Sequence, residues 1–372
     1  MVASDQEDAQ RELLISLGDL VERVMADRHE ALCGAPFCRE TWNMVGSDLG
    51  LLAAALPEAL GGMEAGAAAH GILMKTFGRH LVSQPYLSSM VMASALLDPS
   101  DAFGAEWLSS MARGEAIIVA ALADGPDDLD LQSADTHIVI DPDGWAVTGR
   151  KTLVRDAPLA DHFVVLARHE VGENESVALL MVPANAPGVA REDFRTIDGA
   201  TGSHIRFDDV RVAPTCLIAS GDEARVRAER AIDNGIVAVC AEAVGIMQAM
   251  LEQTVGYARQ RTQFGQPIAS FQVLQHRMVD MSVTIEQAES ITRLARGKLG
   301  SDDRSAAASA AMALVSKACR SVSQAAIQIH GAVGIADETP VSRYFRRATA
   351  IESQFGGREY HLSRYIASSR LR

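Results

Sequence analysis

The sequence predicts an α+β protein with segregated layers: an N-terminal helical domain at 1–114, a central small β-barrel or sandwich at 115–222, and a C-terminal four-helix bundle at 223–372. Three observations predict this order. Apolar residues recur at three- and four-residue spacing in the first region, short apolar runs alternate with turns in the second, and long helical patterns return in the third. Helices, then strands, then a helix bundle is typical of an α+β chain.

The N-terminal prediction depends on one apolar stripe between Gln6 and about Arg113. Its first members recur at helical spacing, which predicts an amphipathic helix: Leu13-Leu14, Leu17, Leu20-Val21 and Val24-Met25.

The central prediction depends on short apolar, partly β-branched runs between Ala116 and about Cys216, which favour strands. Turn residues at 141–144 and 184–188 separate them. The runs are Ile117-Ile118-Val119, His137 to Ile140, Phe163 to Leu166, and Ala178 to Val182.

The C-terminal prediction comprises four long helical segments. Ser301-Asp302-Asp303 interrupts the pattern as a turn with a helix cap. The four segments are about 224–260, 268–298, 303–331 and 340–369.

Composition narrows the class of function. The chain has 372 residues, 48% of them hydrophobic and 22% charged, which is ordinary for a globular protein with a large core. The net charge of −14 argues against a nucleic-acid binder, because affinity for a phosphate backbone depends on clustered Lys and Arg. No N-terminal apolar stretch has the length of a signal peptide or membrane span, so we expect a cytoplasmic protein.

The cysteines predict no metal site. Cys33, Cys38, Cys216, Cys240 and Cys319 form no CxxC pair and no metal-ligand spacing. Cys240 and Cys319 lie in apolar helical runs, where we expect buried thiols.

Two segments point to a phosphate-bearing ligand. The first, RTQFGQPIASFQ at 261–272, places Arg261, Gln263, Phe264 and Gln272 beside a helix start. The arginine fork can donate two hydrogen bonds to a pyrophosphate. The second, QIHGAVG at 328–334, combines a glutamine with small residues that let a flat ligand approach the backbone. Either segment alone is also compatible with an ordinary helix terminus.

Together, in this order and spacing, the two segments resemble those of the acyl-CoA dehydrogenase flavoproteins. The resemblance extends over nearly the whole chain and looks closest to the small subunit of pimeloyl-CoA dehydrogenase and to partner subunits of steroid side-chain dehydrogenases. Further matching stretches are Leu49 to Leu52, Leu56 to Gly62, Trp145 to Lys151, Ala160 to Arg168, and Ile205 to Val212.

The resemblance implies FAD, bound across a subunit interface. It assigns the FAD pyrophosphate of a neighbouring subunit to the first segment, and the adenine end across the same interface to the second. The implied cofactor-binding residues are Arg261, Gln263, Phe264, Gln272, Gln328, Gly331 and Ala332. It further implies an acyl-CoA thioester as substrate in lipid or sterol catabolism, an electron-transfer flavoprotein or similar acceptor, and a homo- or hetero-oligomer.

The catalytic base that the resemblance implies is missing. Most members carry a Glu before Gly-Thr in the last bundle turn, and this alignment places Phe355 there, before Gly356. A phenyl ring cannot accept a proton. The other location of the base, on the first bundle helix, corresponds to Gly235.

Three interpretations remain open. Glu352 or Glu359 could act as a displaced base, although each is also compatible with a solvated helix charge. The chain could instead be an FAD-holding subunit whose partner carries the Glu, or a flavoprotein of this fold with different chemistry. A flavin-free helical interaction protein is the alternative from another class, and the paired segments argue against it.

Other departures lie at the reacting end. The family's Trp-Ile-Thr, which packs on the flavin, corresponds to Leu153-Val154-Arg155, and its TEPxAGSD segment to 123–128. We expect His330 to donate a hydrogen bond within its segment, and His204 and His361 to be structural. The cluster Arg343, Arg346 and Arg347 could meet CoA phosphates or a neighbouring subunit, or be solvated or ion-paired.

Overall fold

The computed structural model describes residues 2–28, 32, 37–125, 131, 135–141, 144–171 and 174–370. Contacts between residues divide the chain into two compact units. The helical unit comprises 1–36, 67–83 and 236–372, and the sheet unit comprises 37–66 and 84–235. The N-terminal helices are thus shared between the two units, and the three-domain division at 114 and 222 stays a prediction.

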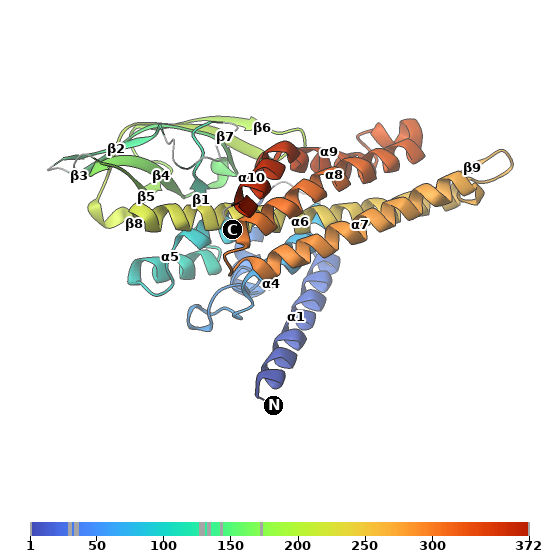
Figure 1. Cartoon of the computed structure of the whole chain (residues 1–372), viewed down its shortest axis with the longest axis horizontal. Coiled ribbons are helices and arrows are strands. Elements are labelled where there is room, and N and C mark those ends of the chain that lie inside the picture. The colour runs from blue at the N-terminus through green and yellow to red at the C-terminus, as the bar shows by residue number, and fades with distance from the viewer. Residues whose placement is uncertain are drawn as a thin grey trace. The chain divides into compact units, whose positions relative to one another are not determined.

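The helical unit contains the long helices of the chain (Figure 1). Its last predicted segment, 340–369, is two helices in the structure. Phe355 and Gly356 between them have positive φ values, 62° and 92°, which end a right-handed helix. The helices are α1 (Val2–Asp27), α4 (Gly66–His80), the part of α6 (Gly221–Gln260) from Ile236 onward, α7 (Gln272–Lys298), α8 (Arg304–His330), α9 (Pro340–Ser353) and α10 (Arg358–Arg370).

In the core of this unit the helices pack on one another through faces of small and apolar side chains. The α8 helix buries fifteen of its residues, many of them alanines, which lets its neighbours approach closely. The α6 helix is long and apolar enough to cross a membrane, but 78% of its apolar window is buried inside the protein. That burial is typical of the core helix of a globular protein.

Close backbone contact between α4 and α6 gives the first prediction. A Cβ on Gly245 would lie 1.9 Å from the Lys75 carbonyl oxygen, and a Cβ on Gly78 would lie 2.1 Å from the Glu242 carbonyl oxygen. We expect Gly245→Ala to lower the free energy of unfolding by about 1–3 kcal/mol, because the helices must separate. Gly256→Ala is the control in the same helix, with nothing within 4 Å; it should stabilise by about 0.5–1 kcal/mol. Urea denaturation measures both, and equal effects would contradict the close crossing.

The sheet unit contains an eight-stranded sheet in the order β6-β7-β3-β2-β4-β5-β8, with β1 parallel to β4. The predicted apolar run at 163–166 lies in β4 and is fully buried, as expected for a central strand. The strands are β1 (Ile118–Ala121), β2 (His137–Asp141), β3 (Gly144–Arg155), β4 (His162–Val171), β5 (Asn174–Pro183), β6 (Val189–Arg195), β7 (Thr201–Val212) and β8 (Leu217–Ser220).

Two short α-helices of the first region belong to the sheet unit, α3 (Arg39–Asn43) and α5 (Ala102–Ala112). Asp101 caps α5: its carboxylate accepts the N–H of Gly104. The helical, then β, then helical order that the sequence predicts is confirmed.

Candidate functional site

A short hairpin carries the first predicted segment. β9 (Thr262–Gln263) pairs with β10 (Gln266–Pro267). Phe264 and Gly265 form the turn with φ values of 53° and 80°, as two-residue hairpin turns require. Glycine adopts such values freely, whereas phenylalanine rarely does. The turn therefore holds the Phe264 ring at the tip, where it is 92% exposed.

Arg261 lies between α6 and this hairpin with its backbone fixed on both sides. Its N–H donates to the Tyr257 carbonyl at 2.8 Å, and its own carbonyl accepts the Ile268 N–H at 2.8 Å. The side chain is exposed and makes no hydrogen bond or ion pair with any residue that the structure describes. The guanidinium is therefore available to an anionic ligand.

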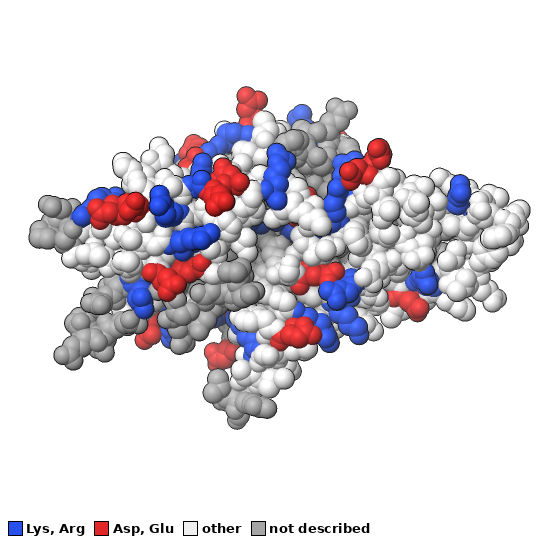
Figure 2. Space-filling model, turned by 90° about the horizontal axis from the view of Figure 1, so that it is seen from above, with Lys and Arg blue, Asp and Glu red and all other residues white. Residues whose placement is uncertain are grey.

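The other predicted residues of this segment are exposed as well. The Gln263 amide donates to the Thr262 carbonyl at 2.9 Å, and Gln272 begins α7. The Phe264 ring packs edge-to-face on Phe271, with ring centroids 6.1 Å apart. Side chains without charge predominate over this end of the helical unit (Figure 2).

The second segment follows the last turn of α8 into a 3-10 helix, η8 (Gly331–Ile335). Gln328, Gly331 and Ala332 are exposed. Gly331 has φ 66° and ψ −144°, a conformation that is essentially restricted to glycine. Nothing lies within 4 Å of the position that its Cβ would occupy. The backbone here therefore has open space beside it, and the adenine-end role that the resemblance implies stays a prediction.

Tyr257 brings the two segments together, and sequence reasoning missed it. Its ring stacks on His330, with ring centroids 4.5 Å apart and planes inclined by 24°. Its carbonyl binds the Arg261 N–H. The only sequence signal was its place one helical turn before Arg261. The helical unit therefore holds the arginine hairpin and the Gln328–Ala332 segment at one end (Figure 1).

These residues fit the dinucleotide part of FAD. A guanidinium without a partner in the described chain suits a pyrophosphate. An exposed glycine with open space above its Cα suits a ring laid against the main chain. These two ends of the candidate site thus present groups whose chemistry suits a pyrophosphate and a flat ring.

The segment expected to face the flavin ring is strained. Leu153 and Asp156, at the end of β3, have φ values of 51° and 58°. Such values are rare for residues other than glycine and concentrate at functional sites. Leu153 is half exposed, and its N–H points at His204 Nδ1, 3.4 Å away. Arg155 between them lies 3.7 Å from Asp198.

Part of the segment at 123–128 is anchored by a buried ion pair. Asp124 pairs with Lys151, whose side chain is fully buried and whose Nζ also donates to the Leu122 carbonyl at 2.9 Å. Asp124 accepts both the N–H and the hydroxyl of Thr136, at 3.0 and 2.9 Å. Residues 126–128 lie outside the described part.

The expected base position lies in the turn between α9 and α10. Phe355 has φ 62° there, and its carbonyl accepts a hydrogen bond from His361 Nε2 at 2.9 Å. The His361 side chain is fully buried. The structural role predicted for His361 is confirmed. Its hydrogen bond fixes the backbone of the turn, and the Phe355 side chain carries no acid or base.

Neighbouring carboxylates are committed elsewhere or solvated. Glu352 forms an ion pair with Arg320: the Arg320 Nε donates a hydrogen bond to Glu352 Oε2 at 2.7 Å, and Nη2 lies 2.6 Å from the same oxygen. Glu359 is exposed near Arg358, 3.7 Å away. Gly235 has no side chain.

The predicted basic cluster is divided. Arg347 is buried in a two-bond ion pair with Glu242 of α6, at 2.6 and 2.7 Å. Arg346 pairs with Asp337 at 2.7 Å, and Arg343 is exposed. The three arginines do not form one anion-binding patch, because helical periodicity directs Arg347 into the core.

The thiols predicted to be buried are buried. Cys240 and Cys319 have no exposed surface, and burial raises the pKa of Cys319 to about 12. Burial raises the pKa of Cys240 as well. Both are therefore protonated and unreactive. Cys33 lies outside the described residues.

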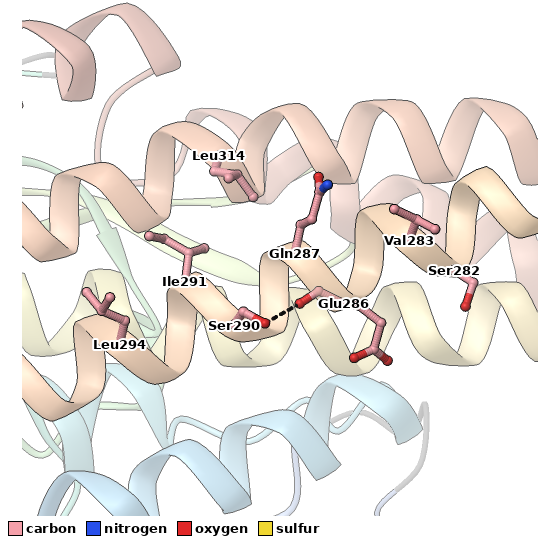
Figure 3. A pocket seen from close by; sticks show the side chains of 8 residues that line it. All are labelled: Ser282, Val283, Glu286, Gln287, Ser290, Ile291, Leu294 and Leu314. Atoms are coloured by element: carbon pink, nitrogen blue, oxygen red, sulfur yellow. Dashed lines mark hydrogen bonds between the residues drawn. The ribbon is translucent and has the colours of Figure 1, made fainter.

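An apolar groove lies on α7, away from the predicted cofactor segments. Figure 3 shows its lining side chains, one of them from α8. Val283 and Leu294 are about half exposed. The lining comprises Ser282, Val283, Glu286, Gln287, Ser290, Ile291, Leu294 and Leu314.

Comparison with known proteins agrees with this architecture. Family models of the acyl-CoA dehydrogenases match the chain over three regions: the N-terminal domain at 7–115, the middle domain at 121–210 and the C-terminal domain at 226–369. The mitochondrial short-chain specific acyl-CoA dehydrogenase of Homo sapiens is 30% identical over 322 residues, covering 84% of this chain and 78% of that protein. Acyl-CoA dehydrogenase FadE27 of Mycobacterium tuberculosis is 29% identical over 344 residues, covering 88% and 87%.

Solved structures give the same assignment. The steroid ACAD Tcur3481-Tcur3483 superposes with a TM-score of 0.85 at 26% identity, covering 97% of this chain and 99% of that one. The ChsE4-ChsE5 complex of Mycobacterium tuberculosis gives 0.83 at 26% identity, covering 97% of each chain. The chain therefore belongs to the acyl-CoA dehydrogenase family, whose members are FAD-binding oxidoreductases that act on the CH–CH bond of acyl-CoA thioesters.

Proposed function

We propose that this chain is the FAD-holding subunit of an acyl-CoA dehydrogenase and that a second subunit carries the catalytic glutamate. The observation that supports this most is the turn between α9 and α10. Phe355 stands where the family base is expected, and His361 fixes the backbone around it. The chain thus combines a residue set suited to the dinucleotide with a position that cannot accept a proton.

The other carboxylates do not replace the base in this proposal. Arg320 holds Glu352 in an ion pair through a hydrogen bond from its Nε, and releasing the carboxylate would break that pair. Glu359 is exposed on α10. A general base must reach its proton within hydrogen-bond distance, so a solvated or paired carboxylate is a poor substitute.

The proposed roles follow from the chemistry of each side chain. Arg261 binds the pyrophosphate, with Gln263, Phe264 and Gln272 around it. Gln328, Gly331 and Ala332 support the adenine end. When bound, FAD would supply the redox chemistry, as the acceptor of the hydride that leaves the β-carbon of the thioester. The partner's carboxylate removes the α-proton.

An uncovered face of α7 supports assembly with another subunit. Met281, Ile285 and Ala288 of α7 face the core. Val279, Val283 and Leu294 recur on the opposite side, with exposed fractions of 59%, 51% and 53%. A helix with apolar residues on both sides is stable in water when a neighbour covers the second one. The groove of Figure 3 lies along this side.

The relatives suggest the setting. Two similar structures are those of a steroid ACAD, Tcur3481-Tcur3483, and of a ChsE4-ChsE5 complex. We propose a lipid or sterol acyl-CoA as substrate, an electron-transfer flavoprotein or similar acceptor, a cytoplasmic location, a dimer or tetramer, and the domain division 1–114, 115–222 and 223–372.

Co-expression tests the proposal. The chain alone should purify with FAD yet dehydrogenate acyl-CoA thioesters about 10²–10⁴-fold more slowly than its complex with a Glu-bearing family member, the range that a positioned base contributes. Changing the partner's glutamate to glutamine should abolish the gain. Equal activity of the chain with and without the partner would contradict the proposed division of labour.

A further inference from the structure

The two proposed cofactor segments belong to different helices, α6 and α8, and their spacing must be fixed if one ligand is to span both. The stack of Tyr257 on His330 joins these helices immediately beside both segments. Tyr257 lies one turn before Arg261, and His330 directly precedes Gly331.

A backbone hydrogen bond links Tyr257 to Arg261, and a side-chain hydrogen bond holds the His330 ring against its own helix. The Tyr257 carbonyl accepts the Arg261 N–H at 2.8 Å. His330 Nδ1 lies 2.9 Å from the Ala326 carbonyl, so this nitrogen carries the proton and donates it. The imidazole is thereby locked against α8, with only 8% of the residue exposed.

The loop after His330 is closed by a second set of contacts. The Thr339 hydroxyl lies 2.9 Å from the Val333 carbonyl and 2.7 Å from the Ala336 carbonyl. Thr339, directly before α9, therefore holds the loop at 333–336, whereas the ring stack joins His330, within the Gln328–Ala332 segment, to Tyr257 of α6. Of these two contacts, the ring stack is the one that connects the segment to Arg261, through Tyr257.

We propose that Tyr257 is a positioning residue whose stack on His330 sets the spacing between the Arg261 hairpin and the Gln328–Ala332 segment, and thereby the affinity for FAD. The inference rests on the proposed cofactor roles of these segments. Tyr257 acts through His330 and through the backbone of Arg261.

Substitution at Tyr257 tests the inference. Tyr257→Leu should weaken FAD binding about 3- to 10-fold, the change expected from losing one aromatic pair. Tyr257→Phe keeps the ring and should bind FAD as the parent protein does. The matched control is Tyr344→Leu, which removes a buried tyrosine of the same unit whose hydroxyl donates to the Arg79 carbonyl. It should lower stability without a comparable loss of FAD.

Hydrogen exchange of the FAD-free protein gives a readout that does not depend on the cofactor. Tyr257→Leu should speed exchange of amides in 328–335, on a helix other than its own, whereas Tyr344→Leu should not. Parental exchange there, or FAD loss in Tyr257→Phe equal to that in Tyr257→Leu, would overturn the inference. A parent protein that binds no FAD would instead refute the proposed cofactor site.

If Tyr257→Leu does not fold, His330→Leu removes the stack from the other side and should give the same two effects. If His330→Leu folds with parental FAD affinity and parental exchange, the positioning role is refuted.

Discussion

Arg261→Ala is expected to weaken FAD binding about 10- to 100-fold, because hydrogen bonds between a guanidinium and a phosphate are charge-assisted and each contributes more than a neutral one. The helical unit should remain as stable as before, since the Arg261 side chain is exposed and contacts no described residue through a hydrogen bond or ion pair. Flavin fluorescence after ultrafiltration measures the affinity, and circular dichroism checks the fold.

Two further variants serve as controls, one for the shape of the side chain and one for its position. Arg261→Lys keeps the positive charge but loses the planar fork, so its affinity should lie between those of the parent and Arg261→Ala. Arg259→Ala removes an exposed arginine two residues earlier and should retain FAD. Full retention of FAD in Arg261→Ala would remove Arg261 from the site.

Arg347→Met is expected to cost about 3–5 kcal/mol of stability, because it leaves the Glu242 carboxylate, whose side chain is only 12% exposed, without the arginine that donates two hydrogen bonds to it. The double variant Arg347→Met with Glu242→Leu should recover most of that loss, since both charges are then removed from the core. Chemical denaturation at neutral pH measures the free energy of unfolding of each variant.

The neighbouring arginine provides the control. Arg346 pairs with Asp337, whose side chain is 80% exposed, so Arg346→Ala should cost at most about 1 kcal/mol. Similar losses for Arg346→Ala and Arg347→Met would contradict the assignment of Arg347 to the core.

The layer order could be predicted because it depends on local periodicity. The runs at 163–166 and 178–182 are central strands, and the long apolar repeats after 223 are helices. The break at Phe355 interrupts the predicted segment at 340–369; its local signal is Gly356-Gly357, a helix-ending pair that apolar periodicity alone does not reveal. The positive φ of Leu153 could not be predicted either, because a leucine gives no local signal for that conformation.

The candidate site likewise contains residues that the sequence could propose and residues whose role depends on tertiary packing. Arg261 and Gly331 could be proposed from the sequence because their chemistry suits a dinucleotide and because the two segments together resemble those of the family. The role of Tyr257 depends on its partner His330, which only tertiary packing brings beside it. The pairing of Arg347 with Glu242 and of Glu352 with Arg320 likewise joins different helices, so sequence alone left the basic cluster and the displaced base open.

The absent base is tested most directly by mixing the FAD-loaded chain, alone and without oxygen, with a panel of acyl-CoA thioesters while the visible absorbance of the oxidised flavin is recorded. The account predicts bleaching about 10²–10⁴-fold slower than in the complex with a Glu-bearing subunit. It also predicts that Glu352→Gln leaves this slow rate unchanged. Rapid bleaching by the chain alone, lost in Glu352→Gln, would contradict the account and identify Glu352 as the base.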